Sequence, residues 1–383
     1  MRRALLRCLV AFALGGATLL TTPASAPADP GTPPTTVAGP APGPASESGS
    51  IVVRAAGDRD PTTGAPLPLA GAVLRAFTDA SLTIAAGECT TDAAGTCTIT
   101  GLAVGTYRVA PVGDPPGATF ARVETVEVSV GGPQRYVDIA VVDEANPTTR
   151  RFAFRRANPP FPARCGVRVT LLYDVSGSIS ASEATTMKAA SNEFVDALAG
   201  TPSSIAIASF ATDAAAAGNT NLAPTSVADT AGVAAVKGAI TALTRPNGVD
   251  RYTNWDAAFR SVVGQSDIVV LFTDGNPTVH GVPAQYPPVL TDLDQLDAGV
   301  LSANAVKAAG ARVLAVGVGD LDALSKDNLA LVSGPVEGAD YAVTTFADVR
   351  SVFRNLANAL CPRPEIPIQV SPEPPPLVPR FTG

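Results

Sequence analysis

The sequence predicts two folded domains in series, an all-β sandwich followed by an α/β domain with a doubly wound, Rossmann-like parallel sheet. Short β-rich runs separated by turn residues fill residues 51–143, which is typical of a sandwich. Apolar runs alternate with helical stretches over residues 164–361, which is typical of a parallel sheet. The 383 residues leave room for both domains and for flexible ends.

The first 28 residues are expected to be an export signal. Arg2 and Arg3 precede an apolar stretch at residues 9–20, and small residues follow it. Cleavage after Ala26 would leave Pro27 behind the cut, so we favour cleavage after Ala28. A membrane span is the weaker alternative, because the apolar stretch is shorter than the ~20 residues that a span needs. We therefore expect a secreted, extracellular chain, free or associated with the cell surface, with no transmembrane segment after maturation.

Residues 29–50 are expected to form a disordered linker, because Pro, Ala, Gly, Thr and Ser leave almost nothing to bury. The sandwich follows at residues 51–143. Its predicted strands lie at residues 51–53, 72–77, 97–100, 106–109, 123–130 and 136–139.

A second connector is expected at residues 144–163. It carries a basic run at residues 150–156 and a Pro-rich run at residues 159–162. A solvated strand edge and a stiff spacer explain these runs better than a binding motif does. The formal net charge of −7 also argues against a sequence-independent nucleic-acid binder, because the basic footprint is missing.

The α/β domain is expected to use apolar strands at residues 167–173, 205–210, 268–272 and 313–318. Ser180 and Glu183 form a capping box at the start of a helix, and apolar residues then recur at helical spacing. Gly200 and Pro202 end that helix. A last helix is expected at residues 347–360, before a Pro-rich, extended tail at residues 362–383.

Oxygen-bearing side chains gather where these strands end. Asp174, Ser176 and Ser178 follow the first strand, Thr253 precedes a helical stretch, and Asp274 follows the most apolar strand. Doubly wound sheets bind ligands beyond the carboxyl ends of their strands. Singly, the serines could cap a helix and Asp274 could make a turn. Together they predict a hard-oxygen site for a divalent cation, Mg²⁺ with Ca²⁺ and Mn²⁺ as alternatives.

These residues resemble the metal-ion-dependent adhesion site (MIDAS) of von Willebrand factor A (vWA) domains. Asp174, Ser176 and Ser178 correspond to its D-x-S-x-S motif, Thr253 to its Thr and Asp274 to its second Asp. The resemblance implies that the serines bind the metal directly, that the carboxylates act partly through water, and that an acidic ligand completes the shell. The Gly-Gly usual before the Thr is replaced here by Arg251-Tyr252.

Four cysteines remain after the expected cleavage, and an even number in an exported chain indicates two disulfides. Their number alone permits three pairings. Cys89 and Cys97 bracket a turn between two strands, so a hairpin staple fits. The vWA resemblance places the two ends of that domain close together and so implies a bridge between Cys165 and Cys361. Stabilisation of an extracellular fold explains such a bridge better than a mechanical limit on the last helix.

The sandwich resembles a Cna-B or prealbumin-like domain of bacterial surface proteins. The matching segments lie at residues 64–67, 71–73, 91–95 and 101–107. Many such domains carry a Lys–Asn isopeptide bond. Residues 51–143 contain neither Lys nor Asn, so that crosslink cannot form here, and the Cys89–Cys97 disulfide would serve in its place.

The sequence therefore predicts an adhesion or protein-binding module whose cation binds an acidic group of an extracellular protein or glycan, with the sandwich as a spacer. A cell-envelope component in which the metal only stabilises the fold is the alternative. An exported metal-dependent hydrolase is less favoured. The chain's one histidine, His280, lies near Asp274 in sequence, but no G-x-S-x-G motif is present.

Overall fold

The computed structural model describes residues 48–360, apart from residues 61, 104, 114, 116–117, 120–123, 129–147, 163, 249, 287–292, 320–325 and 346–347. The predicted export signal, most of the first linker, the strand at residues 136–139, Cys361 and the C-terminal tail lie outside the described residues.

A six-stranded sheet forms the centre of the C-terminal domain, in the order β13-β12-β11-β14-β15-β16. Neighbouring strands are parallel except at β13, which pairs antiparallel with β12 at the edge. The strands are β11 (Arg168–Asp174), β12 (Ser204–Phe210), β13 (Leu222–Ser226), β14 (Ile268–Thr273), β15 (Arg312–Val318) and β16 (Tyr341–Thr344). Every residue of β14 and β15 is buried, which explains their continuous apolar runs.

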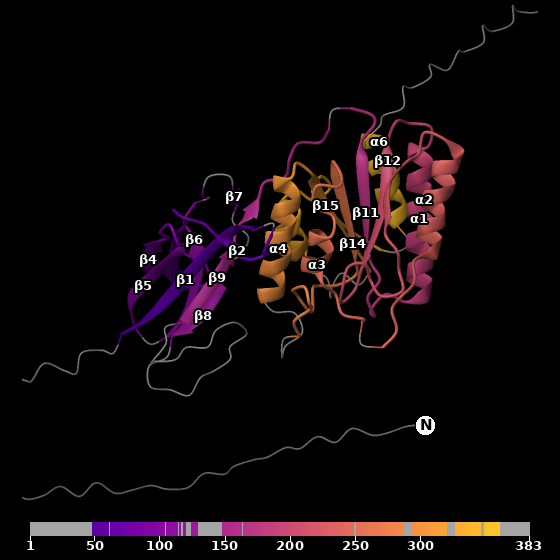
Figure 1. Cartoon of the computed structure of the whole chain (residues 1–383). Helices are drawn as coiled ribbons and strands as arrows, with labels where there is room; N and C mark the ends of the chain where they lie inside the picture. Colours follow the sequence, from indigo (N-terminus) through magenta and orange to yellow (C-terminus); the bar gives the residue numbers. More distant parts are fainter. Residues whose placement is uncertain are drawn as a thin grey trace, which may run out of the picture. The chain divides into compact units, whose positions relative to one another are not determined.

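Helices cover both faces of this sheet (Figure 1). One face shares a core with α1 (Ala181–Leu198), α2 (Thr230–Ala242) and α6 (Val349–Leu360). The other shares a core with α3 (Trp255–Arg260), α4 (Leu293–Ala308) and α5 (Lys326–Val332). Ser180 caps α1 and forms the predicted capping box with Glu183. The predicted α/β sheet is therefore confirmed, as are its four predicted strands.

The N-terminal domain is all-β and has two sheets. One has the order β2-β1-β5 with β9 also on β1, and the other has the order β4-β3-β6-β8. Side chains of both sheets, among them Ile51, Ile99, Leu74 and Val109, share one buried core. The strands are β1 (Ser48–Arg59), β2 (Pro66–Pro68), β3 (Val73–Phe77), β4 (Ala85–Thr90), β5 (Thr96–Ala103), β6 (Gly105–Pro111), β8 (Glu124–Val128) and β9 (Thr148–Ala153).

The predicted Cys89–Cys97 disulfide forms, with the two Cα atoms 5.7 Å apart. Its place differs from the expected hairpin staple. Cys89 lies in β4, which pairs with β3, whereas Cys97 lies in β5, which pairs with β1. The bond therefore joins the two sheets of the domain at the turn where the chain passes from one to the other.

The described part of the predicted connector at residues 144–163 contains two strands. Residues 148–153 form β9, parallel to β1, and β10 (Arg155–Arg156) pairs with β7 (Ala118–Thr119). Within the basic run, Arg155 differs from the expected solvated state, whereas Arg156 is partly exposed and pairs with Asp58. Arg155 is 5% exposed and donates to the Ala330 carbonyl at 2.6 Å, and Lys307 donates to the Arg156 carbonyl at 3.0 Å. These partners come from α5 and α4, 175 and 151 residues further along the chain, so local sequence could not reveal them.

Candidate metal site

The five predicted ligands meet at the carboxyl edge of the sheet. Asp174 ends β11, and Asp274 comes directly after β14, which is the neighbour of β11 in register. Ser176 and Ser178 lie in the turn between β11 and α1, and Thr253 lies in the loop before α3. The parallel register therefore places both carboxylates at the same end of two adjacent strands.

Hydrogen bonds connect all five residues. Ser176 Oγ lies 3.1 Å from Ser178 Oγ, which donates to Asp274 Oδ1 at 2.8 Å. Thr253 Oγ1 donates to Ser176 Oγ at 3.2 Å. The backbone N–H of Ser176 donates to Asp174 Oδ1 at 2.9 Å. The structure thus brings together every residue that the sequence predicted for this site.

The cluster is buried at its base and open at its mouth. Asp174 is fully buried, and Ser176 is 1% and Thr253 5% exposed. Ser178 is exposed and Asp274 is partly exposed. A ligand could therefore approach from the side of Ser178 and Asp274, while Asp174 stays out of reach.

Burial and nearby negative charge raise the pKa of both carboxylates of the site. Burial, with the charge of Asp274 adding to it, raises the pKa of Asp174 to about 7. Burial also raises the pKa of Asp274, although the hydrogen bond from Ser178 opposes this. Among the described residues no Lys or Arg forms an ion pair with either group. Two neighbouring carboxylates that lack a cationic side chain are suited to a bound cation.

The donor set fits a hard divalent ion. It offers two carboxylates and three hydroxyls, which are the oxygen ligands that Mg²⁺, Mn²⁺ and Ca²⁺ accept. Within the described part of the chain no group of three or more His, Cys, Asp or Glu side chains gathers as a metal cluster. The hydroxyls of Ser176, Ser178 and Thr253 would therefore supply the rest of the ligands.

The loop that carries Thr253 is fixed to its neighbours. Gly177 donates its N–H to the Arg251 carbonyl at 2.9 Å, and a Cβ at position 177 would lie 3.0 Å from Arg251 Cβ. Thr253 accepts from the N–H groups of Thr278 and Val279 and donates its own N–H to Thr278 Oγ1. The Arg251-Tyr252 sequence, which departs from the usual Gly-Gly, is thus held against the D-x-S-x-S turn.

Sequence reasoning missed two residues that support the site. Thr273 donates to Asp174 Oδ2 at 2.8 Å, and its place at the end of an apolar strand next to Asp274 was the available signal. Asn254 caps α3 and also donates to the carbonyls of Thr212 and Gly281. An Asn directly before a helical stretch could have been recognised as a cap.

Exposed apolar side chains lie on the two loops beside the site. Tyr252 precedes Thr253 and is 37% exposed, and Tyr286 is 57% exposed. Their rings meet edge to face, with centroids 5.3 Å apart. Val282, on the same loop as Tyr286, is 57% exposed. We call Tyr252, Val282 and Tyr286 the apolar rim of the site.

His280 does not take part in a catalytic triad with the described residues. Its Nδ1 is buried and has no hydrogen-bond partner among them. A Ser–His–Asp arrangement needs both ring nitrogens engaged, one by the serine and one by the carboxylate. Within the part of the chain that the structure describes, such an arrangement is therefore not formed around His280.

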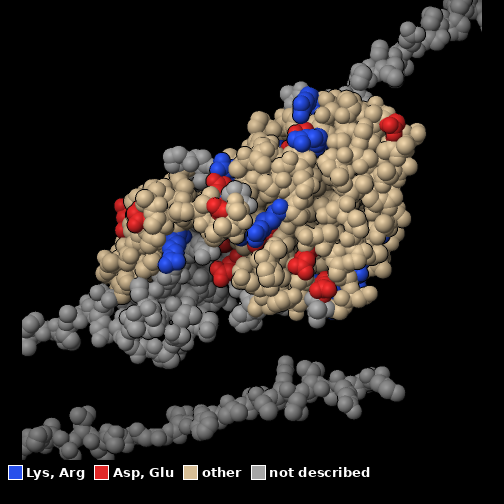
Figure 2. Space-filling model, in the orientation of Figure 1, with Lys and Arg blue, Asp and Glu red and all other residues tan. Residues whose placement is uncertain are grey.

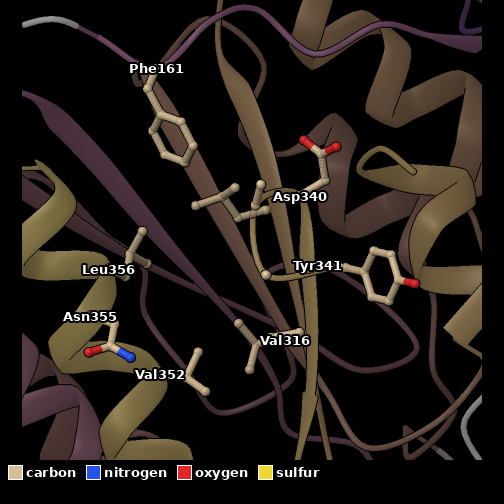
Figure 3. Close-up of a pocket in the computed structure, with 12 residues that line it drawn as sticks. Phe161, Val316, Asp340, Tyr341, Val352, Asn355 and Leu356 are labelled. Atoms are coloured by element: carbon tan, nitrogen blue, oxygen red, sulfur yellow. The ribbon is translucent and has the colours of Figure 1, made fainter. Parts of the chain in front are cut away.

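A cavity of about 300 Å³ lies elsewhere in the domain, between β15, β16, α6 and Phe161 (Figure 3). Val352 and Leu356 of α6 line it together with Val316, so most of its wall is apolar. Asp340, Tyr341 and Asn355 are among its lining residues with polar side-chain atoms. None of the five predicted metal ligands borders it.

Charges on the visible face are scattered. Figure 2 shows Lys and Arg as separated groups among Asp and Glu, without a continuous basic patch on that face. Within the described residues, none of the helices combines the length and the apolar character that crossing a membrane requires.

No family model matches the chain, and no curated protein matches it. Among solved structures, the chain is similar to the pilus adhesin SpaC from Lactobacillus rhamnosus GG in its open conformation, at 17% identity and a TM-score of 0.40, over 54% of this chain and 31% of that one. It is similar to the vWF domain of the type V pili tip protein Mfa5 from Porphyromonas gingivalis, at 13% identity and a TM-score of 0.39, over 52% of this chain and 96% of that one. The minor pilin GBS52 from Streptococcus agalactiae matches at 19% identity and a TM-score of 0.22, over 30% of this chain and 48% of that one. The chain spans about a third of the SpaC structure that it matches. At these TM-scores the likenesses assign neither a family nor a function to this chain.

Proposed function

We propose that this chain is a secreted or surface-exposed binding module, with a vWA-type domain that uses a divalent cation to bind an acidic group of an extracellular ligand. One observation carries the proposal. Five oxygen-bearing side chains from three separate loops form one hydrogen-bonded cluster, with a buried carboxylate at its base and exposed groups at its mouth. The resemblance of the sequence motif to a MIDAS agrees with this geometry.

The chemistry follows from the positions of the residues. Ser176, Ser178 and Thr253 offer their hydroxyls as ligands, and Asp174 and Asp274 supply the negative charge that offsets a dication. A bound cation supplies a centre of positive charge at the exposed edge, where a carboxylate of a partner can complete the shell. Because the five residues of the site include three hydroxyls and no histidine, we propose that the site serves binding rather than catalysis.

The net charge of the chain and the apolar rim indicate which kind of partner fits the site. The formal net charge of the chain is −7, which disfavours association with a densely anionic polymer. Tyr is enriched at protein interfaces and at their energetic centres. The partner that fits best is therefore a protein surface with a single carboxylate among apolar side chains. A glycan with one acidic sugar is the competing outcome.

Isothermal titration with Mg²⁺ and Mn²⁺ tests the metal site. Wild-type protein should bind one ion, and Asp174→Asn should lose that binding while keeping a similar shape at the site. Asp196→Asn is the matched control, because Asp196 is an exposed carboxylate on α1 that pairs with Lys237. Equal metal binding by Asp174→Asn and wild type would refute the site.

The second half of the test concerns the ligand. The protein should bind members of an array of extracellular proteins and acidic glycans in Mg²⁺ but not in EDTA. Binding that survives both EDTA and Asp174→Asn would contradict metal-dependent recognition.

A structural role is the second candidate. It is favoured by the burial of Asp174 beside a second carboxylate, because a cation there would also stabilise the fold. Strong stabilisation by Mg²⁺ together with no binding to any member of the array would support this role over adhesion.

A further inference from the structure

A buried carboxylate lies two residues beyond the N-cap of α3. Asp256 is 1% exposed and is not one of the predicted metal ligands. Its Oδ2 accepts the N–H of Gly281 at 2.9 Å, and its Oδ1 accepts the hydroxyl of Ser302 in α4. An ionised carboxylate at such depth needs a cation beside it.

That cation comes from the other domain. Arg59, the last residue of β1, places Nη2 3.1 Å from Asp256 Oδ1, with the two side chains 11% and 1% exposed. Arg59 also donates to the carbonyl of Gly64 in its own domain and to that of Ala298 in α4 at 3.4 Å. A second arginine, Arg260 of the α/β domain, places Nη1 4.0 Å from Asp256 Oδ2, and its side chain is 32% exposed. Arg59 is therefore the closer and better buried partner.

Asp256 is connected to Thr253 through a short chain of hydrogen bonds. Gly281 is held through both of its backbone polar groups, because its N–H donates to Asp256 and its carbonyl accepts from Asn254 at 3.1 Å. The same loop binds the Thr253 carbonyl through the N–H groups of Thr278 and Val279, at 2.8 and 3.2 Å. Asp256 thus anchors the segment that orients Thr253, whose hydroxyl contacts Ser176.

We propose that Arg59 of the all-β domain is a positioning residue for the metal site, acting through Asp256 on the loop of Thr253. The all-β domain is then part of the binding apparatus rather than a spacer. This inference rests on the proposed metal site and adds to it a required contribution from the other domain.

The physical reason is the asymmetry of a buried ion pair. Removing one partner leaves the other charge uncompensated, and the surrounding structure must rearrange or admit water. Without Arg59, Asp256 loses its closest positive partner and its hold on the Gly281 peptide weakens. Residues that orient metal ligands from outside the metal's own shell typically change metal affinity 10- to 100-fold when they are removed.

The test compares Mn²⁺ affinity, by isothermal titration, in wild type, Arg59→Met, Arg59→Lys and Arg75→Met. Arg75 is the matched control, because it is an arginine of the same domain whose pair with Glu88 is exposed. We expect Arg59→Met to bind Mn²⁺ about tenfold more weakly and Arg75→Met to bind it as wild type does. Arg59→Lys should fall between them, since Lys supplies the charge but lacks the forked set of donors.

A double-mutant cycle with Asp256→Asn tests whether Arg59 acts through Asp256. If Arg59 acts through Asp256, Arg59→Met should cause no further loss of Mn²⁺ affinity in the Asp256→Asn background. Circular dichroism and thermal unfolding of each variant show whether it is folded at the titration temperature. If Arg59→Met does not fold, the comparison of Arg59→Lys with wild type and with Arg75→Met decides the question.

Failure of this inference differs from failure of the metal site. Wild-type protein that binds no Mn²⁺ refutes the site and, with it, this role of Arg59. Wild-type protein that binds Mn²⁺ with the same affinity as folded Arg59→Met refutes only the positioning role. Losses that multiply in the double variant would also refute it, because Arg59 and Asp256 would then act separately.

Discussion

Two regions of the α/β domain each bury a carboxylate, and they differ in whether a cationic side chain pairs with it. At the sheet edge, Asp174 lies beside Asp274 and no cationic side chain among the described residues pairs with either. At the start of β15, Asp340 pairs with Arg312 at 2.5 Å and accepts from Asn158 at 2.8 Å. The second region is a closed structural network, whereas the first lacks its positive charge. This difference, more than burial itself, is the reason why we propose the edge as a binding site.

The largest expected effect separates these two regions directly. Asp174→Asn should lower Mg²⁺ affinity by more than about 100-fold, because it removes a charge from the cation site. It should not destabilise the metal-free protein much, since it also removes like-charge repulsion. Asp340→Asn should do the reverse, leaving Mg²⁺ affinity near wild type and costing about 3–5 kcal/mol of unfolding free energy, because Arg312 is left buried without its carboxylate. Titration calorimetry and urea unfolding measure the two quantities, and an identical pattern in both variants would break the comparison.

Metal binding should stabilise the wild-type fold. At a Mg²⁺ concentration of 100 times the dissociation constant, linkage predicts a gain of about 2.7 kcal/mol in unfolding free energy. Asp174→Asn should show no such gain. Denaturant unfolding with Mg²⁺ and with EDTA gives the comparison, and equal stabilisation of both proteins would place the ion elsewhere.

The metal-free protein should lose stability as pH rises. The pKa of Asp174 is raised to about 7 in the fold, against an ordinary value near 3.8. Between these values the folded state holds a proton that the unfolded state has released, so stability falls with rising pH, by at most about 1.4 kcal/mol per pH unit. Stability measured from pH 4 to 7 in EDTA should show this slope, and Mg²⁺ should oppose it by favouring the ionised form. Asp174→Asn should flatten the profile; an unchanged slope in that variant would assign it to other groups.

A substitution in the apolar rim should have the smallest effect. It distinguishes binding of the protein ligand from binding of the metal. Tyr286→Ala should weaken binding of a protein ligand by about 1–2 kcal/mol without altering Mn²⁺ affinity, because Tyr286 is not one of the predicted metal ligands and its ring packs on Tyr252. Tyr341→Ala, next to the separate cavity, is the control. Surface plasmon resonance against a partner from the extracellular array measures both. Equal losses in the two variants would show that the rim is not part of the ligand surface.

The sheet and the cluster at its edge could be predicted because their signals are local. Buried parallel strands such as β14 are read as continuous apolar runs, and the neighbouring strands β11 and β14 end at oxygen-bearing residues, Asp174 and Thr273. Ser180 and Glu183 mark the start of α1 within four residues.

The junction between the domains could not be predicted because its partners are distant in sequence. Arg155 and Arg156 read as a solvated basic run, yet their partners are Ala330, Asn304 and Lys307. Burial and neighbouring arginines lower the pKa of Lys307, a situation that no local pattern reveals. The Arg59–Asp256 pair likewise joins residues from two domains.

The Cys165–Cys361 bridge stays a prediction: Cys165 is disulfide-bonded, but Cys361 lies outside the described residues.

The most direct test of the account is a crystal structure of the chain grown with Mn²⁺, with anomalous diffraction recorded to locate the ion. The account predicts one strong peak at the carboxyl edge of the sheet, within coordination distance of Ser176 and Ser178 and close to Asp174, Thr253 and Asp274. A map with no peak there at a millimolar concentration of Mn²⁺, or with the ion bound only elsewhere, would contradict it.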